Sequence, residues 1–168
     1  MSLDALARTG PAASSTQPAS AVWTPPEGWR AIERSAIVGA AQDWPRLREA
    51  VLHWVVKRRA GFAIPAGRAT AGQRLLVTAR LGPVVVREPI EVVGVVDEPT
   101  RAGFAYATLA GHPVAGEEAF VAHVDADAVV LTVRSLARAA PAGPWRAAFP
   151  ALRLVQELAL RRYLRALR

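Results

Sequence analysis

The segment 103–120, GFAYATLAGHPVAGEEAF, holds a tyrosine, a threonine, a histidine and two adjacent glutamates among three glycines and one proline. Glutamate, tyrosine and histidine are side chains that donate and accept protons in enzymes, and histidine together with carboxylates also binds metals. The segment therefore has three interpretations: an acid–base site, a metal site or a structural hairpin.

The spacing of the polar residues predicts which of them share a face. In a strand that begins at residue 103, alternation places Phe104, Tyr106 and Thr108 on one side. In the next strand it places Glu118 and Phe120 on one face and Glu117 on the opposite face. Because large aromatic side chains face the core, we expect the tyrosine, the threonine and this glutamate to face it too.

Two interpretations of this cluster stay open. In the first, the cluster lies in an apolar cavity. Burial there raises the pKa of a carboxyl unless a donor such as Tyr106 or an arginine such as Arg134 compensates. A carboxyl with a raised pKa can act as a general acid or base. In the second, Tyr106 and Glu118 bond to each other and brace the hairpin. His112 and Pro113 then order its loop.

The sequence predicts no metal, no cofactor and no nucleophilic cysteine or serine. His112, Glu117 and His123 match no standard metal-ligand spacing. The chain has no cysteine, and Ser35 and Ser135 lack the G-x-S-x-G context of a nucleophile elbow. No glycine-rich loop leads from a strand into a helix to bind phosphates.

The elements that would position this cluster begin with a strand over 30–40 and a helix over 42–61, which Asp43 can cap and Gly61 can end. The apolar stripe of that helix consists of Leu47, Ala50, Val51, Trp54 and Val55. Arg46, Glu49, His53 and Lys57 fall on the opposite face, and we expect them to be solvated.

Residues 62–137 then read as short strands. The runs are 61–66, 73–81, 84–98, 103–109, 117–125 and 128–137. Their short links predict antiparallel neighbours. A long amphipathic helix over 144–168 follows, with Tyr163 in its apolar stripe and arginines opposite. This order is the helix-grip arrangement of an α+β domain, in which a curved sheet wraps the last helix around a cavity.

Candidate ligand-contacting residues follow from this arrangement. They are Trp54, Phe104, Tyr106, Thr108, Glu118, Phe120 and Arg134, with His112 in the connecting loop. We expect a small, mostly apolar ligand, with an enzyme that uses the Tyr106–Glu118 pair as the alternative.

Length and composition predict one globular domain. The 168 residues are 52% hydrophobic, which suits a single core. Residues 1–22 are small, polar and interrupted by proline, so we expect a disordered tail, with the domain over 23–168. No run approaches the roughly 20 apolar residues that span a bilayer, and no signal peptide is recognisable. A cytoplasmic location is the expectation.

Charge suggests a further alternative. The net charge is +7, and Lys57 is the one lysine among 21 basic residues. A cluster of arginines next to Tyr163 could bind the phosphates of a nucleic acid. Its members are Arg161, Arg162, Arg165 and Arg168. Because Tyr163 belongs to the apolar stripe, and because arginines near a helix C-terminus favourably meet its dipole, we rank nucleic-acid binding below ligand binding. The sequence indicates no oligomeric state.

The sequence also resembles a known family. The resemblance is carried by Trp54, by GF-Y-TL--HP--GEE-F at 103–120 and by RRYLRAL at 161–167, and it extends from about Trp29 to the C-terminus. The family is catalogued as domain of unknown function nineteen-ninety. The resemblance implies a fold of the START and Bet v 1 type, in agreement with the order of elements, and no particular activity.

Overall fold

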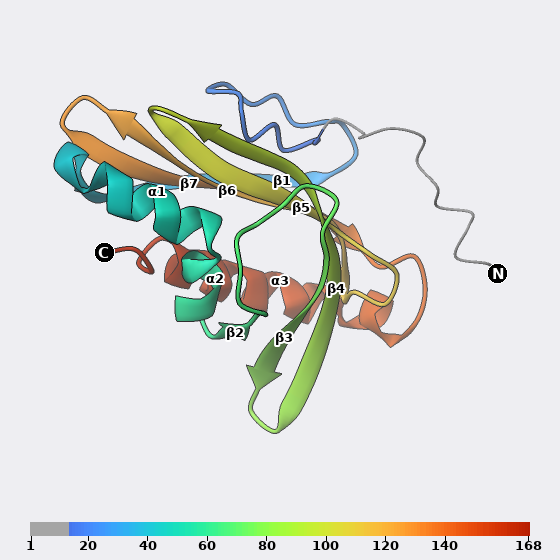
Figure 1. Cartoon of the computed structure of the whole chain (residues 1–168). Helices are drawn as coiled ribbons and strands as arrows, with labels where there is room; N and C mark the ends of the chain where they lie inside the picture. Colours follow the sequence, from blue (N-terminus) through green and yellow to red (C-terminus); the bar gives the residue numbers. More distant parts are fainter. Residues whose placement is uncertain (1–13) are drawn as a thin grey trace.

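A seven-stranded antiparallel sheet is the framework of the chain in a computed structural model, which describes residues 14–168 (Figure 1). The strands lie side by side in the order β1-β7-β6-β5-β4-β3-β2. Their bounds are β1 Arg30–Ala40, β2 Phe62–Ala63, β3 Arg74–Leu81, β4 Val84–Glu98, β5 Arg101–Thr108, β6 Val114–Asp125 and β7 Ala128–Ala139. The predicted antiparallel strands and the helix-grip order are confirmed.

Three helices lie on one face of this curved sheet (Figure 1). They are α1 Trp44–Leu52, which follows the short 3-10 turn η2 Ala41–Asp43, α2 Val55–Arg59 and the long α3 Pro144–Tyr163. Helix α1 contacts β5 and β6, and α3 contacts β6 and β7. Strand β6, which carries residues 114–120 of the segment 103–120, therefore contacts both α1 and α3.

The single helix predicted over 42–61 is divided into α1 and α2. Trp54, between the two, has φ 63° in the left-handed region, which is unusual for a bulky residue. Its indole is buried against Phe104, with ring centroids 4.2 Å apart. Packing of the indole therefore accompanies a turn that redirects α2. As a result Lys57, expected on the solvated face, is 2% exposed, and that expectation was wrong.

An aromatic core joins the sheet to the helices. Phe104 and Phe120 are directly paired across β5 and β6, and their ring centroids are 5.7 Å apart. Phe120 also meets Tyr163 of α3 edge to face at 4.9 Å, a favourable aromatic geometry. The predicted inward face of β5 and β6 is therefore the core face.

The last helix is shorter than predicted. Helix α3 ends at Tyr163 rather than continuing to 168, and Pro150 lies inside it. Leu160 and Tyr163 are buried, as the apolar stripe indicated. Gln156 ties this helix to the sheet by donating through Nε2 to Ser135 Oγ of β7 at 2.7 Å.

Residues 14–22 lie against the face of the sheet opposite the helices (Figure 1). Ser14 and Pro18 stand 3.5 Å from where a Cβ on Gly94 of β4 would be. The disordered tail expected over 1–22 thus differs from the structure for residues 14–22, while residues 1–13 lie outside the described range. None of the described helices is long and apolar enough to cross a membrane.

Candidate functional site

A pocket of about 210 Å³ lies between α3, α2 and the inner face of the sheet. Much of its wall is apolar and comes from β2, β3, β4 and α3, with Phe62, Ala79, Val86, Leu152, Val155 and Ala159 among the lining residues. Polar residues also line the pocket, among them Lys57 of α2, Glu88 of β4, Tyr106 and Thr108 of β5, His112 of the β5–β6 loop and Glu118 of β6, with Arg80, Ser135, Gln156 and Arg162 elsewhere in the wall. Concave, mostly apolar pockets with a few convergent polar groups are typical of small-molecule sites.

The polar wall is centred on the Tyr106 hydroxyl. Tyr106 and Glu118 are cross-strand partners in the β5–β6 register, and the hydroxyl donates to Glu118 Oε2. The same hydroxyl accepts a hydrogen bond from Lys57 Nζ, which also lies 3.5 Å from Glu118 Oε2. These three side chains come from α2, β5 and β6, so the fold brings them together from distant parts of the sequence.

A second carboxyl extends this network toward the β5–β6 loop. Glu88 Oε2 lies 4.0 Å from Lys57 Nζ and 3.9 Å from His112 Nε2. His112 Nδ1 accepts from the Val114 backbone N–H at 3.0 Å. Neutral histidine carries a single ring proton, so the Nε2 position holds it and faces Glu88.

Burial sets the protonation states around the pocket. Desolvation raises the pKa of Glu88, a change that the Lys57 charge opposes and the Glu118 charge adds to. Desolvation, followed by the Lys57 charge, lowers the pKa of His112 to about 3. Burial and then the Glu118 charge raise the pKa of Tyr106 well above its usual value. The imidazole is therefore neutral, and the phenol keeps its proton and donates it to a carboxylate.

This arrangement can orient a polar group of a ligand and can move protons. Glu88 accepts a proton at a higher pH than an ordinary glutamate because its burial disfavours the charged form. The ammonium, phenol and carboxylate around Tyr106 form a continuous hydrogen-bonded path. Such networks are suited to general acid–base work on a bound molecule.

Thr108, a predicted site residue, and Glu117 belong to the same strands but have different environments. Thr108 lines the pocket, and its Oγ1 accepts from the Gly116 N–H at 2.9 Å. Glu117, one residue before Glu118, turns its carboxylate to the opposite face and binds the Thr16 N–H at 2.8 Å. Alternation along β6 therefore separates the two adjacent glutamates, as the sequence indicated.

Trp54, Phe104 and Phe120 do not contribute to the pocket wall. All three are at most 1% exposed and pack within the core next to the pocket. They support the strands and the α1–α2 turn that place the polar side chains.

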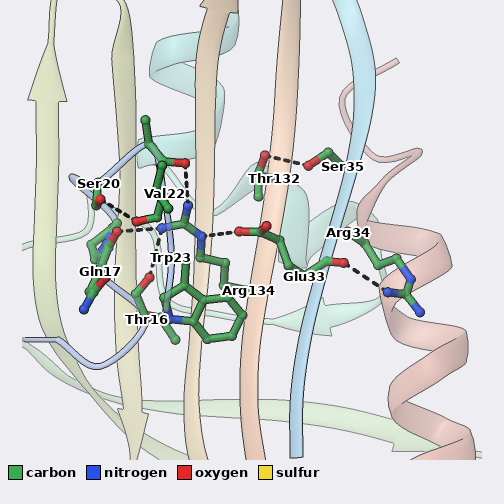
Figure 2. Close-up of polar contacts among 12 residues, drawn as sticks. Thr16, Gln17, Ser20, Val22, Trp23, Glu33, Arg34, Ser35, Thr132 and Arg134 are labelled. Carbon is green, nitrogen blue, oxygen red and sulfur yellow. Dashed lines mark hydrogen bonds and ion pairs between the residues drawn. The ribbon is translucent and has the colours of Figure 1, made fainter. Parts of the chain in front are cut away.

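Arg134 lies on the other side of the sheet, contrary to its predicted place beside Glu118 (Figure 2). Its Nε donates to Glu33 Oε2 at 2.6 Å, and its Nη atoms donate to the backbone carbonyls of Thr16, Gln17 and Ala21. The prediction was wrong because β7 alternates like its neighbours: Ser135 faces the pocket, so Arg134 faces outward.

Among the pocket residues that the sequence analysis did not predict are Lys57 and Glu88. The prediction for Lys57 failed because helical periodicity was extended through Trp54, where the helix breaks. Glu88 lies on β4, in a run interpreted as a plain strand. One signal was present: Lys57 is the only lysine in a chain rich in arginine.

Neither a metal site nor a nucleic-acid interface at the C-terminal arginines gains support from the structure. Among residues 14–168, no three histidine, cysteine or acidic side chains gather closely enough to bind a metal. Tyr163 is 2% exposed within the core, so its ring does not lie on the surface with the neighbouring arginines.

Comparison with known proteins places the chain in a family. The family model described as domain of unknown function (DUF1990) matches residues 13–166. The chain belongs to this family. The match begins at residue 13, so the DUF1990 domain includes the segment 14–22 that lies on the outer face of the sheet. A comparison with curated proteins finds no significant match.

Solved structures share the fold of this DUF1990 chain. The ZhuI aromatase/cyclase from Streptomyces sp. R1128 is 16% identical with a TM-score of 0.58, over 83% of this chain and 91% of that one. The hypothetical protein jhp0584 from Helicobacter pylori is 12% identical with a TM-score of 0.52, over 84% and 86%. Ara h 8.0201 is 11% identical with a TM-score of 0.50, over 82% and 96%. The DUF1990 fold is therefore START/Bet v 1-like.

Proposed function

We propose that this protein binds a small, mostly apolar molecule in the pocket between α3 and the sheet. The observation that carries the proposal is the composition of the pocket wall, which is largely apolar but includes the bonded set Lys57, Tyr106 and Glu118. Transfer of an apolar ligand from water into the pocket lowers its free energy, and these side chains would orient a polar group on the ligand.

A blocking substitution tests the proposal. Ala159 of α3 lines the pocket, so Ala159→Phe places a phenyl ring inside it. Ala151, on the same helix, is exposed and does not line the pocket, so Ala151→Phe is a matched control. Ala79→Phe fills the pocket from β3 and serves if the Ala159 variant fails to fold.

The measurement is the fluorescence of N-phenyl-1-naphthylamine, a neutral apolar dye, titrated into each protein. We expect saturable binding to the wild type and to Ala151→Phe. A blocking variant should bind at least about tenfold more weakly, equivalent to about 1.4 kcal/mol. Equal affinity in folded wild-type, blocked and control proteins would show that the dye binds elsewhere and would contradict the proposal.

A further inference from the structure

Lys57 is the only lysine in the sequence. The chain has 21 basic residues, and 20 of them are arginine. Arginine cannot lose its proton in proteins, whereas a lysine amine can become a nucleophile that forms Schiff bases with carbonyl compounds. Lys57 is therefore the only side chain of the sequence that has this chemistry.

The structure places this amine in the pocket wall. Lys57 is 2% exposed, yet it lines the pocket together with Tyr106 and Glu118. It enters from α2 because of the break at Trp54. Solvation of a charged group at a surface does not account for a lysine in this position.

The surroundings of the amine include groups that accept and return protons. Glu118 Oε2 lies 3.5 Å and Glu88 Oε2 4.0 Å from Nζ, and the Tyr106 hydroxyl accepts its hydrogen bond. Two carboxyls therefore stand beside one amine, and His112 next to Glu88 contributes no charge because its pKa is lowered to about 3.

Aromatic rings also face the amine. Nζ lies 4.5 Å from the ring centroid of Phe62, 4.6 Å from that of Tyr106 and 5.7 Å from that of Tyr163. Such rings stabilise a cation above their faces. A protonated imine carries the same positive charge on the same nitrogen, so these rings and carboxylates suit the product as well as the free ammonium.

We propose that Lys57 forms a reversible imine with an apolar aldehyde or ketone bound in the pocket, an inference that rests on the proposed ligand-binding function. The ammonium first gives a proton to Glu118 or Glu88. The freed amine forms a bond to the carbonyl carbon while the C=O π bond breaks, and the oxygen takes a proton from the nitrogen of the adduct, which gives a neutral carbinolamine. The same carboxyl then returns its proton as the hydroxyl leaves as water. The net change converts ammonium and carbonyl into protonated imine and water, with no oxidant or reductant.

Reductive trapping tests the imine. The probe is 2-naphthaldehyde with sodium cyanoborohydride, which reduces an imine to a stable secondary amine, and the readout is intact-mass and peptide mass spectrometry. The chain's own N-terminal amine is the internal reference for non-specific labelling. We expect labelling at Lys57 at least about tenfold faster than at the N-terminal amine, because the pocket raises the effective concentration of the aldehyde.

Variants place the reaction in the pocket. Lys57→Arg keeps the positive charge but has no amine at residue 57. It should lose the label at residue 57, while labelling of the N-terminal amine is unchanged. The blocked Ala159→Phe protein should lose internal labelling, and Ala151→Phe should keep it. Lys57 labelled no faster than the N-terminal amine, or labelled equally in Ala159→Phe, would overturn the imine.

The matched alcohol 2-naphthalenemethanol separates this proposal from the broader one, because it has the same ring system but cannot form an imine. If the alcohol and the dye bind in the pocket while the aldehyde is not trapped, the imine is wrong and the binding function stands. If neither alcohol nor dye binds in the pocket, both proposals fail. Competition of the alcohol against trapping supports both.

Discussion

The hydroxyl of Tyr106 joins the lysine and the glutamate of the pocket, and its removal tests the network at the scale of a single residue. Tyr106→Phe loses the bonds to Lys57 and Glu118 but keeps the ring that packs in the core. We expect a loss of about 1–3 kcal/mol in the free energy of unfolding, measured by urea denaturation. The chain's other tyrosine gives a control: Tyr163 is 2% exposed, and Tyr163→Phe also removes a phenol hydroxyl, but not one that bonds to Lys57 or Glu118. A loss for Tyr106→Phe no larger than for Tyr163→Phe would count against the network.

His112 gives a pH dependence whose direction is fixed by its burial. Its pKa falls from 6.5 to about 3 on folding, so between these values the unfolded chain binds the extra proton. Stability contributed by the neutral imidazole is therefore present above about pH 6.5 and is lost as the pH falls toward 3. The full effect is on the order of 3–5 kcal/mol.

The variant His112→Asn isolates this contribution. Asparagine Oδ1 can replace Nδ1 as the acceptor for the Val114 N–H but does not titrate. We expect the stability of the wild type to fall more steeply than that of the variant between pH 6.5 and 4 in urea denaturation. Above pH 7 both side chains are neutral, and the difference between the proteins should be constant there. Parallel curves at lower pH would contradict the neutral buried imidazole.

At the scale of elements, two strand glycines predict how closely the sheet is packed. A Cβ on Gly103 of β5 would lie 2.1 Å from the Phe120 carbonyl oxygen, whereas one on Gly94 of β4 would meet ordinary contacts at 3.5 Å. Gly103→Ala therefore requires backbone movement at the pairing that sets Tyr106 against Glu118. We expect it to cost more than about 2 kcal/mol, within the range for overpacked sites.

Gly94→Ala is the matched control, and we expect a change below about 1 kcal/mol. Both free energies come from thermal or urea unfolding. Similar losses at the two glycines would mean that the β5–β6 backbones do not approach as closely as the structure describes.

Sequence patterns predicted the elements well because period-2 alternation and short links act locally. The bounds of β1 and β4 match the predicted strands, and alternation correctly separated Glu117 from Glu118. The break at Trp54 could not be predicted in this way, because it depends on a tertiary contact of the indole with Phe104. That one break moved Lys57 from a predicted solvated face into the pocket.

The same limit applies to Arg134. Its residue type suggested one of two partners, with Tyr106 as the other, that could compensate a buried glutamate. Which glutamate it meets depends on the register of β7 against β1, where Arg134 is paired with Glu33. Register between strands about a hundred residues apart is a property of the assembled sheet, not of a local pattern.

At the scale of the whole molecule, we predict that residues 14–22 stabilise the domain through their contacts with the outer face of the sheet. Glu117 binds backbone N–H groups of Ser15 and Thr16, while Arg101 donates to carbonyls of Pro18 and Ser20. Small apolar side chains of β5 and β6 form a separate buried cluster at the sheet: Ala105, Ala119 and Val121, with Val93 of β4 packed against them.

Removal of residues 1–22 is therefore expected to lower the midpoint of thermal unfolding by several degrees, because Arg134 loses its carbonyl partners (Figure 2) and buried donors are costly when unpaired. Removal of residues 1–13 alone is the control and should leave the midpoint close to that of the full chain. Equal midpoints for the full chain and the shorter truncation, with no fall for the longer one, would contradict a stabilising segment.

The central claim is that the pocket between α3 and the sheet holds a small molecule, and native mass spectrometry of protein purified from its own host tests it most directly. We predict that the wild type and Ala151→Phe retain a bound small molecule, and that Ala159→Phe, whose new ring occupies the pocket, does not. Wild-type protein that carries no small molecule, or a folded Ala159→Phe protein that carries as much as the wild type, would contradict the claim.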